Sequence, residues 1–118
     1  MTCLIACLST GKGTWGHVSR LIKDGEWEKI ILITNDFGKE NFTAEKPAEM
    51  IVVNDRQGLE EVRDGIKKQL AEKLTGTEVA LNLVSGTGKE HMALISSLLQ
   101  LGFGIRLVAL TKDGIKEI

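Results

Sequence analysis

The sequence alternates short, continuous apolar runs with segments of helical periodicity, and this alternation constrains the fold more than any other feature. The runs are too uniformly apolar for strands with one solvated face, so they predict strands that are buried on both faces. Buried strands that alternate with helices are typical of a parallel sheet covered on both sides. We therefore predict an α/β fold, a Rossmann-like three-layer α/β/α sandwich with a mostly parallel sheet of about six strands.

The expected elements fill a chain of 118 residues, which suits one domain over residues 1–118. Strands are predicted at residues 4–8, 30–33, 50–53, 79–84 and 105–110, with a turn at 112–114 and an antiparallel return over 115–118. Helices are predicted over 15–23, over about 59–74 with Asn54 or Asp55 as cap and Gly76 as stop, and over 92–101, ending at Gly102. The last helix is nearly all apolar and is expected to be well buried. Residues 34–47 are polar and favour a loop with at most a short helix.

Two of the predicted strand-to-helix loops share a pattern. The loop after the first strand reads Ser9, Thr10, Gly11, Lys12, Gly13, Thr14, and the loop after the fourth reads Ser85, Gly86, Thr87, Gly88, Lys89. Helix N-termini present unpaired N–H groups, glycines allow close backbone approach, and hydroxyl and ammonium groups add donors. Strands 1 and 4 should flank the point where the strand order reverses, which is where open α/β sheets bind ligands. The two loops therefore predict a site for a phosphate-bearing ligand.

Thr87 and Glu90 have the spacing of a capping box, with Thr87 as the N-cap and Glu90 at the third helical position. Such a box would fix the start of the helix and aim the amides that follow Gly86 toward a ligand. The alternative is a purely structural role, in which both loops are polar turns with glycine caps.

Two common phosphate motifs fit the loops poorly. A Walker A loop fails at both lysines, because Glu90 follows Lys89 and Gly13 follows Lys12 where Ser or Thr is required. The dinucleotide fingerprint has a match at Gly11, Gly13 and Gly16, and Asp36 is its candidate ribose partner. That match leaves the second loop unexplained, so a dinucleotide or phosphate-ester enzyme stays an alternative.

Several further residues are candidates for the site or for its support. His17 and His91 can serve as acid or base, or can be half-buried helix residues. Trp15 can stack on a base, although a core or dimer-interface position is favoured. Asn35 and Asp36 end the second strand at the same edge and are predicted to contact ribose or base. Within strands, Asn82 requires a hydrogen-bond partner if buried, and Arg106 is expected at a dimer surface or a carboxylate.

Charge and composition exclude several classes. The net charge is −1 and the pI is about 6.1, without the basic excess of proteins that bind long nucleic acid. No run reaches the length of a membrane span, and the first residues lack the basic region of a signal peptide, so we expect a cytoplasmic protein. Cys3 and Cys7 lie too far apart along one strand for a disulfide. Without a Cys/His cluster, no metal site and no cofactor are expected.

The segment Val79–Leu110, from a hydrophobic strand through Ser85-Gly86-Thr87-Gly88-Lys89 into an apolar helix, resembles the second motif of CARF domains, the CRISPR-associated Rossmann-fold sensors. The first loop, with Ser9, Thr10 and Gly11, is similar to the first ligand loop of that family. The predicted terminal hairpin also fits the family's six-stranded core, so the resemblance spans essentially the whole chain.

The resemblance implies a homodimer that binds a cyclic oligoadenylate, with cyclic tetra-adenylate expected, across its twofold axis in type III CRISPR signalling. Ring nucleases of the family also cleave the ring without metal, by attack of a ribose 2′-hydroxyl. Lys89, Ser9 and Thr10 match the residues that assist there. Because 118 residues leave no room for a fused effector, three interpretations stay open: a ring nuclease, a binding module, or a sensor that acts through a separate effector protein. A nucleotide-binding regulatory module unrelated to CRISPR is the non-enzymatic alternative.

Overall fold

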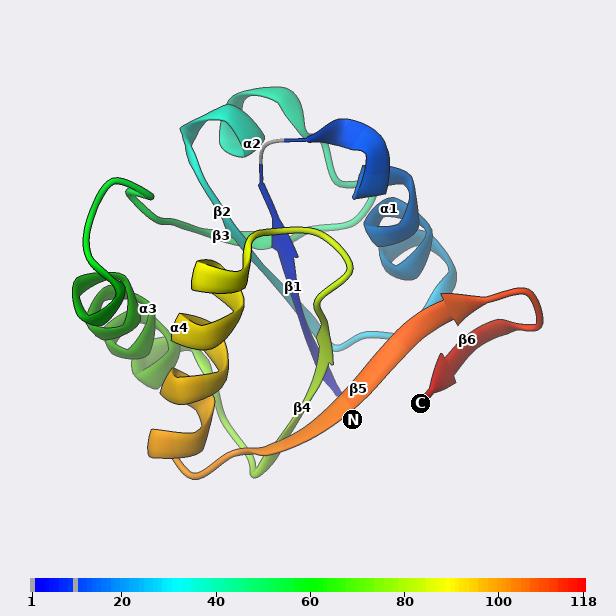
Figure 1. The fold of residues 1–118 in the computed structure, drawn as a ribbon. Helices are drawn as coiled ribbons and strands as arrows, with labels where there is room; N and C mark the ends of the chain where they lie inside the picture. Colours follow the sequence, from blue (N-terminus) through cyan, green and yellow to red (C-terminus); the bar gives the residue numbers. More distant parts are fainter. Residues whose placement is uncertain (1, 10) are drawn as a thin grey trace.

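A computed structural model describes residues 2–9 and 11–118 and has the predicted three-layer α/β architecture (Figure 1). Its strands are β1 (Cys3–Leu8), β2 (Lys29–Thr34), β3 (Glu49–Val52), β4 (Glu78–Asn82), β5 (Gly104–Thr111) and β6 (Gly114–Glu117). Its helices are α1 (Trp15–Asp24), preceded by a 3-10 turn at Lys12–Thr14, α2 (Asp36–Asn41), α3 (Leu59–Lys73) and α4 (Gly88–Gln100).

The six strands form a sheet in the order β3-β2-β1-β4-β5-β6. All neighbours are parallel except β5 and β6, which form the predicted antiparallel hairpin. The chain leaves β1 toward β2 and β3, and later returns to β4 on the other side of β1, so the order reverses between β1 and β4. The predicted switch point is therefore confirmed, with Ala6 of β1 opposite Asn82 of β4 near its carboxyl end.

Two apolar clusters hold the layers together, one on each face of the sheet. On one face, α3 and α4 pack against alternate residues of the central strands, including Ile5, Ile33 and Leu81. On the other face, α1 packs against the residues between them, such as Leu4 and Leu32. Because both faces of β1 are covered, its residues Leu4–Leu8 are fully buried, as the continuous apolar run predicts.

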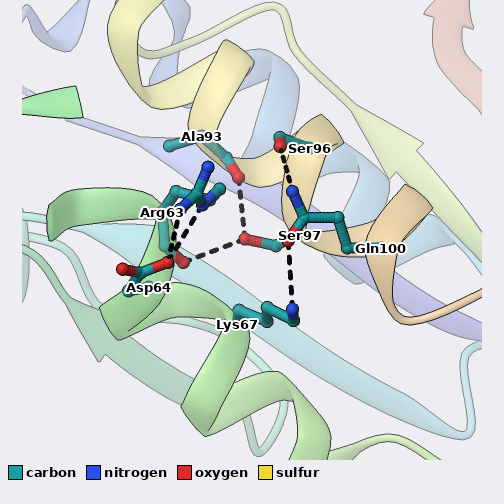
Figure 2. Close-up of polar contacts among 7 residues, drawn as sticks. All are labelled: Arg63, Asp64, Lys67, Ala93, Ser96, Ser97 and Gln100. Carbon is teal, nitrogen blue, oxygen red and sulfur yellow. Dashed lines mark hydrogen bonds and ion pairs between the residues drawn. The ribbon is translucent and has the colours of Figure 1, made fainter. Parts of the chain in front are cut away.

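Polar contacts fix α3 against α4 (Figure 2). The hydroxyl of Ser97 is fully buried and donates to the carbonyl of Ala93 at 2.8 Å and to the carbonyl of Arg63 at 3.1 Å. At the edge of the same seam, the ammonium of Lys67 donates to the side-chain oxygen of Gln100 at 3.0 Å. These hydrogen bonds to α3 help to hold α4, and with it its first turn, in position.

Three sequence predictions about boundaries are wrong. β4 ends at Asn82 and not at Val84, because the Asn82 side chain accepts the backbone N–H of Val84 at 3.2 Å and turns the chain. The cap of α3 is Gly58, and Asn54 instead closes a turn by accepting from the N–H of Arg56. At the other end of α3, Lys73 is the last helical residue, so Gly76 is not its immediate stop.

The prediction that the last helix is well buried is also wrong in part. Met92 and Leu99 are each 64% exposed. They are seven residues apart, which places them on one stripe of α4 that faces away from the sheet. The structure leaves this apolar stripe uncovered.

Candidate functional site

The two predicted loops lie at the switch point, at the carboxyl ends of the adjacent strands β1 and β4. Each contains one glycine with a left-handed backbone, Gly11 at φ 104° and Gly86 at φ 99°. We call residues 9–14, residues 83–87 and the first turn of α4 the switch-point loops. Thr10, one of the predicted catalytic residues, lies outside the described residues.

The second loop closes tightly on β1. A Cβ built on Gly86 would lie 2.8 Å from the Cβ of Cys7 and 3.0 Å from Nε2 of His91. His91 Nε2 donates to the carbonyl of Ser85 at 2.8 Å, which places the ring proton on that nitrogen. His91, in the first turn of α4, therefore stabilises the preceding loop through this hydrogen bond. Cys7 beneath the loop is unreactive, since burial and the neighbouring Glu90 carboxylate raise the pKa of its thiol.

The first turn of α4 is built as the capping box predicts. The Thr87 hydroxyl accepts from the N–H of Glu90 at 3.2 Å, and the Glu90 carboxylate accepts from the N–H of Thr87 at 2.8 Å. The box satisfies those two amides and leaves the N–H groups of Gly88 and Lys89 without acceptors inside the helix. These two amides and the positive end of the helix dipole form the anion-binding element of the site.

Two buried hydroxyls stand at this point, one from each loop. Ser9 and Ser85 are each only 2% exposed. Within residues 2–9 and 11–118, neither hydroxyl has a hydrogen-bond partner, and the second carboxylate oxygen of Glu90 is likewise unpaired. Buried polar groups are normally satisfied, so these unpaired oxygens at the same sheet edge are candidate contacts for a ligand.

The two lysines of the loops point to different neighbours. The ammonium of Lys12 lies 5.9 Å from the ring centre of Trp15 and 5.7 Å from that of Phe37. The ammonium of Lys89 instead reaches the β3–α3 loop, where it donates to the carbonyls of Asp55, at 3.1 Å, and Gln57. Lys89 therefore links the switch-point loops to the neighbouring connection.

Some candidates support the fold. His17 Nε2 accepts the backbone N–H of Leu110 at 3.2 Å and the amide of Asn82 at 3.1 Å, and burial lowers the pKa of its imidazole. Trp15 is 8% exposed and donates its indole N–H to the carbonyl of Ser9 at 2.9 Å, a core position that confirms the favoured interpretation. Arg106 pairs with the carboxylates of Glu78 and Glu117.

The first loop departs from the dinucleotide alternative. In that fingerprint the third glycine permits close helix–strand packing. A Cβ at Gly16, or at Gly13, would meet no atom within 4 Å. Among the glycines of the two loops, the one that close packing requires is Gly86, in the second loop.

A cavity of about 650 Å³ lies at the carboxyl ends of β2 and β3. It contains the predicted residues Asn35 and Asp36, and also Phe37, Asp55 and Arg56, which sequence reasoning missed. Asn35 caps α2 by accepting from the N–H of Gly38 at 2.9 Å. The position of Asp55 directly after a buried strand could have indicated a site residue. The helical periodicity that follows it favoured a helix cap instead.

Metal-binding and membrane-spanning features are not seen in the described part of the chain. No group of three or more His, Cys, Asp and Glu side chains there could hold a metal ion. None of the described helices is long and apolar enough to cross a bilayer.

Comparison of the chain with family models, with curated proteins and with solved structures finds no match.

Proposed function

We propose that two copies of this chain bind one cyclic oligoadenylate, with the switch-point loops of each copy holding half of the ring. The observation that carries the proposal is the pair of buried hydroxyls of Ser9 and Ser85, unpaired within the described residues, at the switch point where the first amides of α4 lack acceptors inside the helix. Hydroxyl and amide donors at a helix N-terminus match the acceptor oxygens of a phosphodiester. The resemblance of both loops to the ligand loops of CARF domains points to the same ligand class.

The uncovered apolar stripe on α4 supports the proposal that a second copy of the chain binds there. Met92 and Leu99 on α4, Val84 at the loop and Leu107 on β5 are all more than 40% exposed. Val84 directly precedes Ser85, so a copy seated on this surface brings its own loops close to these. A twofold pair of loops matches a ring of repeated units.

The proposal is for binding. Lys89, which the resemblance assigns to catalysis, has its ammonium on two backbone carbonyls of the β3–α3 loop. Cleavage requires that ammonium to move to the phosphate while O2′ gives up its proton and bonds to phosphorus, and while the bond to O5′ breaks and O5′ takes up a proton. Metal-independent cleavage thus stays a prediction, which incubation of labelled cyclic tetra-adenylate with the protein and EDTA tests. Linear products that disappear in Lys89→Ala would support a ring nuclease.

Substitution of the serines tests the binding site, because it should change the stability of the free protein and its affinity for the ligand in opposite directions. Ser85→Ala removes an unpaired buried hydroxyl, so the free protein should keep or gain stability, while binding of cyclic tetra-adenylate weakens. Ser97→Ala is the matched control: it removes a buried hydroxyl that has two acceptors, so it should lose about 1 kcal/mol of stability and leave binding intact. Unchanged binding in both Ser9→Ala and Ser85→Ala would contradict the proposed site.

A further inference from the structure

The cavity at the carboxyl ends of β2 and β3 contains charged groups without partners. The charged residues Asp36, Asp55 and Arg56 all border it. In the described part of the chain none of these three groups has a side-chain ion pair or hydrogen bond. Some charged side chains elsewhere on the molecule do pair, as Arg106 does with Glu78 at 2.9 Å.

One wall of the cavity is aromatic and leads to the first switch-point loop. Phe37 is 40% exposed, and its ring centre lies 5.8 Å from that of Trp15. Trp15 donates to the carbonyl of Ser9, and the ammonium of Lys12 lies near both rings. The exposed ring of Phe37 is therefore held in place beside the loop that carries Ser9.

The opposite wall leads to the second switch-point loop. A smaller cavity of about 320 Å³ shares Val53 and Asp55 with the first and is also bordered by Thr87, Lys89 and Glu90. Lys89 connects α4 to the residues that the two cavities share, since its ammonium donates to the carbonyl of Asp55. A ligand at the first turn of α4 can therefore extend into the larger cavity.

The charges of the two regions differ in sign. The switch-point loops offer amides, hydroxyls and the cations Lys12 and Lys89, which outnumber their one carboxylate, Glu90, and attract phosphate. The cavity has two carboxylates against one guanidinium, which disfavours phosphate and favours groups that donate hydrogen bonds. Ribose hydroxyls and the amino group of a base are such donors, and the face of Phe37 offers a stacking surface for the base.

We infer that this cavity binds the nucleoside part of the ligand, with the base on Phe37 and the hydroxyl or amino donors on Asp36 and Asp55. The inference rests on the proposed function, because it takes the switch-point loops as the place of the phosphate. It assigns a direction to each bound nucleotide: phosphate between β1 and β4, nucleoside toward β2 and β3.

Calorimetric titration of adenosine 5′-monophosphate, ribose 5-phosphate and inorganic phosphate tests the assignment. In the wild type, the monophosphate should bind at least about tenfold more tightly than inorganic phosphate. Stacking and hydrogen bonding of one base contribute an advantage of this size. Phe37→Ala should remove the advantage of the monophosphate over ribose 5-phosphate. Asp36→Asn and Asp55→Asn should weaken the monophosphate while inorganic phosphate binds equally or more tightly, because a repelling charge is gone. Asp113→Asn, in the exposed β5–β6 turn, should change neither.

The same titrations with cyclic tetra-adenylate separate the two proposals. Wild-type binding of the ring that is unaffected by Phe37→Ala, Asp36→Asn and Asp55→Asn would overturn the nucleoside assignment alone. Equal weakening of phosphate and monophosphate in the Asp variants, with unchanged thermal unfolding, would also overturn it. A wild type that binds no adenylate would overturn the assignment and the proposed function together.

Discussion

A Cβ atom at Gly86 would lie 2.8 Å from the Cβ of Cys7, so the β4–α4 loop touches β1 with no space for a side chain. Gly86 also has a φ of 99°, a backbone conformation that other residues adopt only with strain. We therefore expect Gly86→Ala to destabilise the fold by about 2–4 kcal/mol, from strain and displacement together. Urea unfolding measures this loss.

Gly88→Ala is the matched control for that substitution. A Cβ at Gly88 would meet no atom within 4 Å, and Gly88 is the first residue of α4. Its stability should stay within about 0.5 kcal/mol of the wild type or rise slightly. Equal losses in the two variants would show that the close contact with Cys7 is not what constrains the loop.

The Thr87 cap gives a second stability prediction. Thr87→Ala removes the hydroxyl that accepts from the N–H of Glu90, so the protein should lose about 0.5–2 kcal/mol. Thr87→Ser keeps the acceptor and should retain nearly all of the wild-type stability in the same urea experiment. If Thr87→Ser were as unstable as Thr87→Ala, the cap would contribute nothing measurable.

The neutral state of His17 gives a prediction on pH. Burial lowers the pKa of its imidazole below the ordinary value of 6.5, so the unfolded chain takes up a proton more readily than the folded one. The stabilising contribution of neutral His17 is complete above pH 6.5 and is lost as the pH falls toward the folded pKa. His17→Gln keeps an acceptor for Leu110 without titrating, so the fall in stability below pH 6.5 should be shallower in this variant. Identical pH profiles would contradict the assignment of Nε2 as acceptor.

The uncovered stripe on α4 predicts where two copies meet. Met92→Glu together with Leu99→Glu should convert the proposed dimer to a monomer, because each apolar side chain that an interface buries contributes about 1.5–3 kcal/mol. Light scattering coupled to size exclusion measures the mass. Ile118→Glu changes an apolar residue that is 75% exposed at the chain end and should leave the proposed dimer intact. A dimer that survives the double substitution would place the interface elsewhere.

The sequence predicted the layers, the sheet order around the switch point and the capping box, because each depends on local periodicity or on a spacing of three residues. Asn82 was harder, since its side chain ends β4 early by binding the N–H of Val84. The exposure of Met92 and Leu99 could not be read from composition, because an apolar helix can face a core or a partner. The cavity residues Phe37, Asp55 and Arg56 come together only when β2 and β3 pair.

The stoichiometry of ring binding tests the central claim most directly. Calorimetric titration of the wild type with cyclic tetra-adenylate should give about one ring for two chains, since in the proposed complex both copies hold the same ring, and Ser85→Ala should weaken the binding. Binding of one ring to each chain, or no heat of binding at micromolar protein and ligand, would contradict the account.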